Sequence, residues 1–244
     1  VVSSLNAFNF QSDTSNTNNH ALRMDFARLM LTEDPNASRT AAMRTAEESA
    51  KAAHLLAQGV ASAVSGYTAW AASTPNTGNY NTTYDISMRL RDVARLIHSG
   101  AETRIFYTGH GGFDTHAGQI TPHNTLMLRL NNALAAFRAD MVAMNEWNNV
   151  AVMVISEFGR RNFENGSNGT DHGHGNVVMV MGGAVNGGSY GPDIEDSTID
   201  REYLPYEIDF RTVFRQVVER HLGHDPAPLF TEAAQKPISP GQFI

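Results

Sequence analysis

The stretch Asn149-Val-Ala-Val-Met-Val-Ile-Ser156 decides the fold class that this sequence predicts. Its central residues are apolar and mostly β-branched, and no polar residue alternates with them before Ser156. Such a run is typical of a parallel strand that is covered on both faces. The run NVVMVMG at 176–182 has the same character. The two runs therefore predict buried strands.

Helical patterns flank these two runs. Residues 103–108, TRIFYT, predict a further short buried strand, and residues 86–97 before them have helical periodicity. Apolar residues recur every three or four positions over 122–145, which predicts a long helix, and residues 210–218 predict a late amphipathic one. The alternation predicts an α/β fold: a mostly parallel sheet with helices on both faces.

The first 84 residues differ in composition from the rest. Residues 1–20 are rich in Ser, Asn and Thr and predict an irregular arm, whereas 21–31 and 38–64 are Ala-rich and predict two helices. Residues 73–84 read as a polar, turn-rich loop. We therefore expect an N-terminal region, 1–84, that caps the sheet or packs on it, and an α/β core at 85–244.

Composition excludes several classes of function. The net charge of -7 and the lack of Lys and Arg clusters argue against a nucleic-acid partner, and no apolar run approaches the roughly 20 residues of a transmembrane helix. The sequence has no cysteine, which excludes zinc thiolate sites, disulfides and cysteine nucleophiles. Any metal ion must be held by His, carboxylate and neutral oxygen.

Two polar clusters follow predicted strands, where ligands gather in parallel sheets. In GHGGFDTH at 109–116, Asp114 and His116 offer an oxygen and a nitrogen two residues apart, and the glycines let the backbone approach an ion. In SEFGRR at 156–161, Glu157 can bind metal or act as a base, and Arg160 or Arg161 can hold an anionic ester. The structural alternatives are a capped turn beside a surface histidine, and a surface ion pair.

A third cluster, GTDHGHGN at 169–176, packs Asp171, His172 and His174 between glycines. Core packing explains such a loop poorly, and metal binding explains it better. If this loop folds back to the same sheet edge, the clusters form one site for zinc, manganese, calcium or magnesium, and hydrolysis becomes the default chemistry. Alternatively, the loop organises only hydrogen bonds and holds no ion.

The order of these motifs resembles the alkaline phosphatase and sulfatase superfamily. More closely, GGFDTHAGQ, ISEFGRR and NGSNGTDHGHGN look like a bacterial family of unknown function that lies beside the sulfatases and whose members are often exported by the twin-arginine route. The resemblance covers about residues 85–190. It implies an alkaline phosphatase-like fold, a divalent metal ion, a small anionic ester as substrate, and a periplasmic or extracellular location.

The resemblance also implies roles for single residues. One metal ion would take Asp114, His116 and His172 or His174. The superfamily places an Asp-His pair for a second metal where this sequence has Glu157 and Phe158. Its first-strand aspartate and its Ser or Thr nucleophile have no counterpart before residue 85, so the chain is expected to be a C-terminal portion whose sheet an N-terminal segment completes.

Two functions follow from these expectations. The first is a metal-dependent hydrolase of phosphate or sulfate esters, with Glu157 as ligand or base and Arg160 on the anion. The metal-ligand candidates are Asp114, His116, Glu157, Asp171, His172 and His174. The second is a catalytically degenerate relative that keeps its metal for stability and serves as a binding or surface-assembly module; Phe158 and the missing nucleophile favour it.

Overall fold

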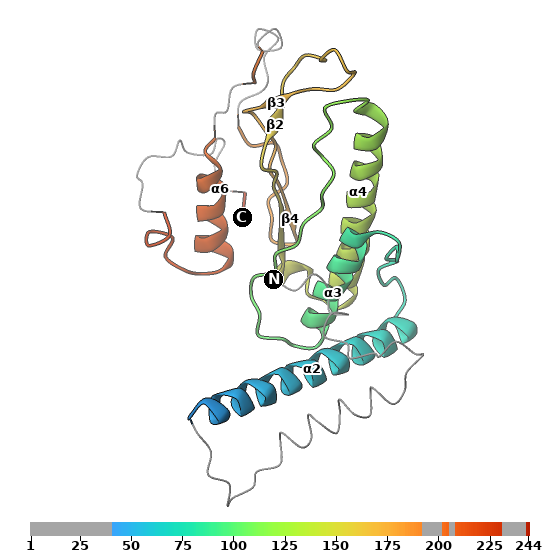
Figure 1. Ribbon diagram of the computed structural model, residues 1–244, viewed down its shortest axis with the longest axis vertical. Helices are drawn as coiled ribbons and strands as arrows, with labels where there is room; N and C mark the ends of the chain where they lie inside the picture. The colour runs from blue at the N-terminus through green and yellow to red at the C-terminus, as the bar shows by residue number, and fades with distance from the viewer. Residues whose placement is uncertain (1–40, 192–201, 205–207, 231–242) are drawn as a thin grey trace, which may run out of the picture. The chain divides into compact units, whose positions relative to one another are not determined.

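The structure is a computed structural model that describes residues 41–191, 202–204, 208–230 and 243–244 (Figure 1). In the first helix, side chains are described for Leu55 and from residue 58 onward. The chain divides into two compact units. Of the described residues, one unit comprises those up to His110 together with Asn132–Asp140, and the other comprises Gly111–Asn131 together with those from Met141 onward.

The first unit is helical. Helix α2, Ala41–Ser73, and helix α3, Asp85–His98, both match helices expected from the sequence, although α2 runs nine residues beyond the expected end at residue 64. The Ala-rich composition favours α2 because alanine has the highest intrinsic helix propensity. Gly100 ends α3: its φ of 72° suits a residue without Cβ, and its N–H donates to the Ile97 carbonyl at 3.0 Å. The expected helix at 21–31 lies outside the described residues.

A buried carboxylate anchors the connection between α2 and α3. Asp140 has no exposed surface; it accepts hydrogen bonds from the Tyr67 hydroxyl at 2.5 Å and from the Gly78 N–H at 2.6 Å. Burial, followed by the hydrogen bond to Asp140, raises the pKa of Tyr67 above its ordinary value. One acidic side chain therefore ties the chain on both sides of Ser73 to a third helix.

That third helix is α4, Ile120–Ala143, which confirms the long helix expected at 122–145. Its buried positions include Leu126, Leu130, Phe137 and Met141, which recur at helical spacing. The apolar repeat over 122–145 places Met127 on the expected buried face, but Met127 is 40% exposed and Leu126 is buried in its place. Asn145, with φ 61°, follows the end of the helix.

The strands of the second unit form two small antiparallel pairs. Strand β1, Ala151–Val154, pairs with β4, Met179–Gly182, and strand β2, Gly159–Arg160, pairs with β3, His172–Gly173. A short 3₁₀ turn, η2 at Trp147–Asn149, leads into β1. Both runs that were expected to form strands, 149–156 and 176–182, do contain one.

The expected fold class is wrong. The described residues contain two two-stranded antiparallel sheets and no large parallel sheet, and residues 103–108 form no strand. Ile105 and Tyr107 in that segment are 71% and 80% exposed. A parallel pairing of β1 with β4 needs a crossover connection, usually a helix, but the chain between them forms the β2–β3 pair and returns antiparallel. An apolar run does not reveal strand direction.

Residues 208–230 and 243–244 contribute side chains that pack against strands β1 and β4. Helix α6, Phe210–Gln216, confirms the late helix and continues into a π-helical turn, η3, Val217–His221. Val213 and Phe243 form a core with half-buried side chains of both long strands, among them Met153 and Val180. In the part of the chain that the structure describes, no helix combines the length and apolarity required to cross a bilayer.

Candidate metal centre

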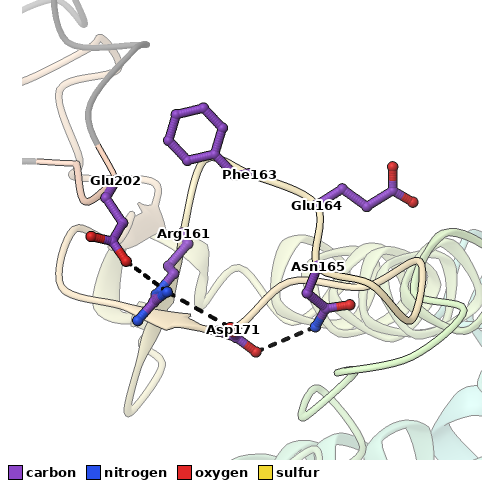
Figure 2. A pocket seen from close by; sticks show the side chains of 6 residues that line it. All are labelled: Arg161, Phe163, Glu164, Asn165, Asp171 and Glu202. Carbon is purple, nitrogen blue, oxygen red and sulfur yellow. Dashed lines mark hydrogen bonds and ion pairs between the residues drawn. The ribbon is translucent and has the colours of Figure 1, made fainter.

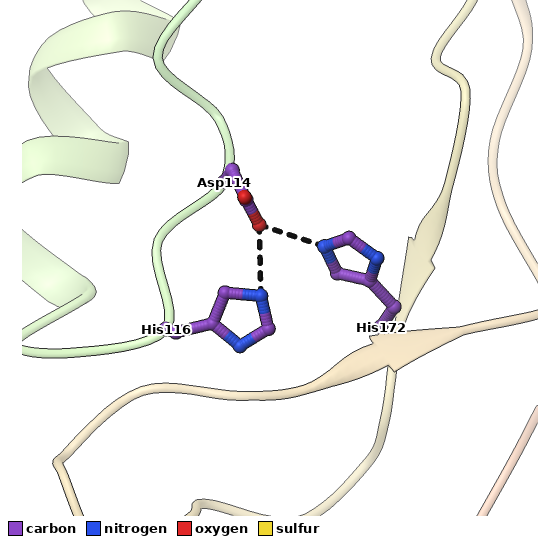
Figure 3. A group of neighbouring side chains, drawn as sticks. All are labelled: Asp114, His116 and His172. Atoms are coloured by element: carbon purple, nitrogen blue, oxygen red, sulfur yellow. Dashed lines mark hydrogen bonds and ion pairs between the residues drawn. The ribbon is translucent and has the colours of Figure 1, made fainter.

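Three side chains from two distant segments converge on one point of the second unit. Asp114 Oδ1 lies 2.8 Å from His116 Nε2 and 2.7 Å from His172 Nε2, and both rings turn toward this one oxygen (Figure 3). The three ligand atoms lie within 4.8 Å of one another. The side chains are exposed by 63%, 46% and 46%, so solvent and small molecules can reach the point between them. We call this group the triad.

The loop before α4 presents Asp114 and His116 together because of a tight turn. The N–H of Thr115 donates to the Phe113 carbonyl at 2.9 Å, which centres a three-residue turn on Asp114. The Thr115 side chain is buried, whereas both of its neighbours are exposed. In the order Asp-Thr-His, the side chains of Asp114 and His116 are therefore exposed to solvent, and the Thr115 side chain between them is buried.

The β2–β3 pair supplies His172, which lies opposite Arg160 in the register. The other paired residues are Gly159 and Gly173, and both must be glycine because of close backbone approach. A Cβ on Gly173 would lie 2.5 Å from the backbone of Arg160, and one on Gly159 would collide with the Gly175 carbonyl. Gly159 and Gly173 therefore allow the two short strands and the chain after them to approach backbone to backbone.

The segment between β2 and β3 docks on the segment that carries His116. The N–H groups of Gly118 and Gln119 donate to the carbonyls of Ser167 and Asn168, each at 2.9 Å. A Cβ on Gly169 would collide with the carbonyl of His116, so only glycine permits this approach. Backbone contacts thus hold the loop that carries Asp114 and His116 against the loop that leads to His172.

Asn165 organises this docking through its amide. Its Oδ1 accepts from the N–H groups of Ser167 at 2.9 Å and Gly169 at 3.1 Å. Its Nδ2 donates to the His116 carbonyl at 2.9 Å and to Asp171 Oδ1 at 3.3 Å. With two donors on one side and two acceptors on the other, only one amide orientation satisfies all four contacts.

Electrostatics keep both aspartates of the centre ionised. The hydrogen bond from His172 holds the pKa of Asp114 below its usual range; desolvation opposes this shift, and His116 and Arg160 add to it electrostatically. Asp171 also has a lowered pKa, first because of its hydrogen bond from Asn165 and then because of His116. Anionic carboxylates are the form that binds cations.

Arg160 connects the two segments that carry the triad. Its guanidinium donates to the carbonyls of Thr170 and Phe113, both at 2.5 Å, and thereby links the chain before His172 to the chain before Asp114. The Nη2 atom of Arg160 also lies 3.6 Å from Asp114 Oδ1, and the Arg160 side chain is 18% exposed. The residue expected to contact an anion thus has a structural role as well, next to the place where an anion would bind.

An open depression of about 390 Å³ borders the centre on the side of Asp171 (Figure 2). Arg161 lies in it, with Nη1 2.7 Å from Glu202 Oε1 and 3.8 Å from Asp171 Oδ2. The Nη2 group of Arg161 donates to the Tyr203 hydroxyl at 2.6 Å, and the Tyr203 ring also lies against His174, at a centroid distance of 4.7 Å. Carboxylates already neutralise the Arg161 charge.

The expected site residues fall into three groups. The structure brings Asp114, His116 and His172 together as possible ligands, and Asp171 contacts the second nitrogen of His116 at 3.3 Å. Glu157 and His174 lie outside the triad, and their roles stay predictions. Sequence reasoning missed Asn165 as an organiser, although NGSNG at 165–169 carries the Asn and Gly typical of a tight turn.

The donor set and spacing fit one divalent ion. Two imidazole nitrogens and one carboxylate suit zinc or manganese, whereas calcium and magnesium prefer oxygen alone. Ligand atoms of a tetrahedral site with bonds of about 2.0–2.1 Å lie about 3.4 Å apart, so the two separations between Asp114 and the histidines, 2.8 and 2.7 Å, would widen by roughly half an ångström. Exposed side chains can make that adjustment, and three protein ligands leave a fourth position free.

Comparisons with known proteins locate the chain within one family. Residues 2–239 match a family model described as Protein of unknown function (DUF1501). Searches of curated proteins and of solved structures return no match.

Proposed function

Because the chain belongs to the DUF1501 family of proteins of unknown function, we propose a function from its own side chains: a metal-dependent hydrolase of phosphate or sulfate esters. The convergence of Asp114 Oδ1, His116 Nε2 and His172 Nε2 carries this proposal. Three ligands with a free fourth position are typical of catalytic metal sites, whereas structural zinc sites fill all four positions with protein.

The chemistry of such a centre is hydrolysis. A divalent ion held there would polarise an ester oxygen and lower the pKa of nearby water. Hydrolysis breaks the bond between the ester oxygen and phosphorus or sulfur; water supplies the new oxygen, and one of its protons leaves with the alcohol. The motif order that resembles the alkaline phosphatase and sulfatase superfamily supports an anionic ester as the substrate.

Two further residues have proposed roles. Arg160 holds its guanidinium 3.6 Å from Asp114, so an anion at the free position would meet a positive charge. Glu157 follows β1 closely and is exposed, which allows it to accept a proton from water as a general base. Both assignments concern substrate turnover, and neither is needed for the triad to bind metal.

A second candidate is a binding module whose metal ion stabilises the fold without catalysis. The position of Phe158 favours it, since the residue that takes the place of an expected imidazole ligand packs flat on His172 with ring centroids 3.9 Å apart. Its side chain cannot coordinate, so the centre holds one ion at most by this ligand set. Metal binding without turnover would identify this second function.

Elemental analysis after dialysis against a weak chelator tests the proposal. We expect one equivalent of zinc or manganese in the wild type and loss of metal in Asp114→Ala and His172→Ala. His174→Ala is the matched control, because it removes an exposed imidazole two residues from His172 but outside the triad. Hydrolysis of nitrophenyl phosphate or sulfate by the metal-loaded wild type would support the enzyme. Absence of metal from the wild type would sink both candidates.

A further inference from the structure

The two nitrogens of His116 face two different carboxylates. Nε2 points to Asp114 in the triad, at 2.8 Å, and Nδ1 lies 3.3 Å from Asp171 Oδ1. An imidazole that binds a metal through one nitrogen carries its proton on the other nitrogen, and that N–H needs an acceptor. Asp171 is an acceptor at the required place, on the side of the ring away from the triad.

From this geometry we propose that Asp171, held by Asn165, is a positioning residue that fixes the ring and tautomer of His116 for metal binding. The inference rests on the metal site of the proposed function. Asp171, which the sequence predicts as a metal ligand, thus supports the ligand His116 and does not bind the ion itself. The Nδ1–H group of His116 donates a hydrogen bond to Asp171 and keeps its proton, so Nε2 keeps its lone pair for the ion.

Asn165 holds the carboxylate and the histidine backbone at once. Its Nδ2 donates to Asp171 Oδ1 at 3.3 Å and to the His116 carbonyl at 2.9 Å. A rotation of Asp171 away from His116 would break the first contact, while the second keeps the His116 backbone in register with the loop. The amide therefore fixes the distance between acceptor and ring from both ends.

His172 is oriented differently. Its ring stacks on Phe158, and its Nε2 faces Asp114. The two imidazoles of the triad thus have unlike supports: a hydrogen-bonded carboxylate for His116 and an aromatic face for His172. Loss of Asp171 should disturb His116 and leave His172 in place.

Zinc affinity of the full chain, measured by competition with a chromogenic chelator, tests the role of Asp171. We expect Asp171→Ala to weaken affinity about 10- to 100-fold, as loss of such outer partners does in other metal sites, and His116→Ala to weaken it more. Asp171→Asn keeps an acceptor oxygen and should fall between Asp171→Ala and the wild type. Glu164→Gln is the matched control, because it removes one negative charge from the same depression outside the triad; it should stay within about twofold of the wild type.

A second variant tests the support that Asn165 gives to Asp171 and His116. Asn165→Asp keeps the oxygen that accepts from Ser167 and Gly169 but replaces Nδ2, which donates to Asp171 and to the His116 carbonyl, with an oxygen that repels both. The added negative charge alone would strengthen binding of a cation. A fall in zinc affinity in this variant would therefore come from lost positioning.

Nuclear magnetic resonance of the zinc-loaded protein gives a readout that loop structure alone would not change. In the wild type and in Glu164→Gln, the Nδ1 proton of His116 should appear as a protected resonance; in Asp171→Ala it should exchange with water and disappear. If the wild type binds no zinc, this inference falls together with the proposed function. If wild type, Glu164→Gln and Asp171→Ala bind zinc equally and keep this resonance, the positioning role alone is overturned.

Discussion

Phe158 stacks on the imidazole of His172 with ring centroids 3.9 Å apart and planes 11° from parallel. The guanidinium carbon of Arg160 lies 5.0 Å from the centroid of the same Phe158 ring. The phenylalanine thus belongs to the support of the triad, although it cannot bind an ion itself. Its flat contact restricts rotation of the His172 ring and keeps Nε2 directed at Asp114.

Replacing Phe158 should therefore weaken metal binding without removing it. Phe158→Leu keeps an apolar side chain but loses the stacking, which is worth about 0.5–1.5 kcal/mol and corresponds to roughly a 2- to 10-fold loss of zinc affinity. Phe163→Leu is the matched control, since Phe163 is 49% exposed and outside the triad. Equal zinc affinity in both variants would contradict the supporting role of Phe158.

Metal binding should depend on pH through the histidines and not through Asp114. The hydrogen bond from His172 lowers the pKa of Asp114, so this carboxylate keeps its charge well below neutral pH. Imidazole ligands must be neutral to bind, so zinc affinity should decrease as pH falls below about 6. Asp114→Asn should weaken affinity by a similar factor at each pH from 5 to 8. Affinity of the wild type that stays flat over this range would exclude imidazole ligands.

The docking of the two loops should fail when Gly169 gains a side chain. Gly169→Ala places a Cβ against the backbone of His116, and we expect a loss of about 1–3 kcal/mol in the free energy of unfolding together with weaker zinc binding. Gly166→Ala is the control in the same loop, because a Cβ there meets no atom within 4 Å. Urea unfolding and a zinc titration measure both effects, and similar behaviour of the two variants would refute the close approach.

The buried carboxylate of the first unit should make Tyr67 important for stability. Tyr67→Phe leaves Asp140 Oδ2 without its hydroxyl donor inside the protein, which should cost about 1–3 kcal/mol in urea unfolding. Tyr107→Phe, at a position 80% exposed, should change stability by less than about 0.5 kcal/mol. Equal stability of the two variants would show that the hydroxyl is not required.

The stability contributed by the Tyr67 hydroxyl should depend on pH. The folded protein raises the pKa of Tyr67 above the value of about 10 expected in the unfolded chain. The stability that comes from this shift is fully present below pH 10 and decreases as pH rises toward the folded pKa. The stability difference between wild type and Tyr67→Phe should therefore be constant from pH 7 to 9.

Sequence periodicity predicted the elements of this fold better than their arrangement. Residues 122–145 and 86–97 gave helices because an amphipathic repeat is a local property. Strand direction is not local: β1 and β4 are both short apolar runs, and only the path of the chain between them makes them antiparallel. The exposed segment 103–108 illustrates the same limit, since apolar composition alone does not provide a neighbouring strand.

The triad was predictable because its residues are concentrated in short, glycine-rich motifs. Spacing alone could not separate ligands from supports, however. Asp171 and His172 are adjacent in sequence, but Asp171 contacts the far nitrogen of His116 and His172 contacts Asp114. The sequence does not reveal the role of Asn165, because asparagine is common in turns and its four contacts depend on loops that meet only in the folded chain.

The two-residue pairing of β2 with β3 limits how this chain can change in length during evolution. Side chains alternate between the faces of a strand, so one residue inserted within β3 would turn His172 away from Asp114. The same insertion between Phe163 and Glu164, both exposed, would only enlarge a loop whose ends stay paired. Among relatives that retain the triad, length variation should therefore occur near Phe163 and Glu164 and be absent from the two paired strands.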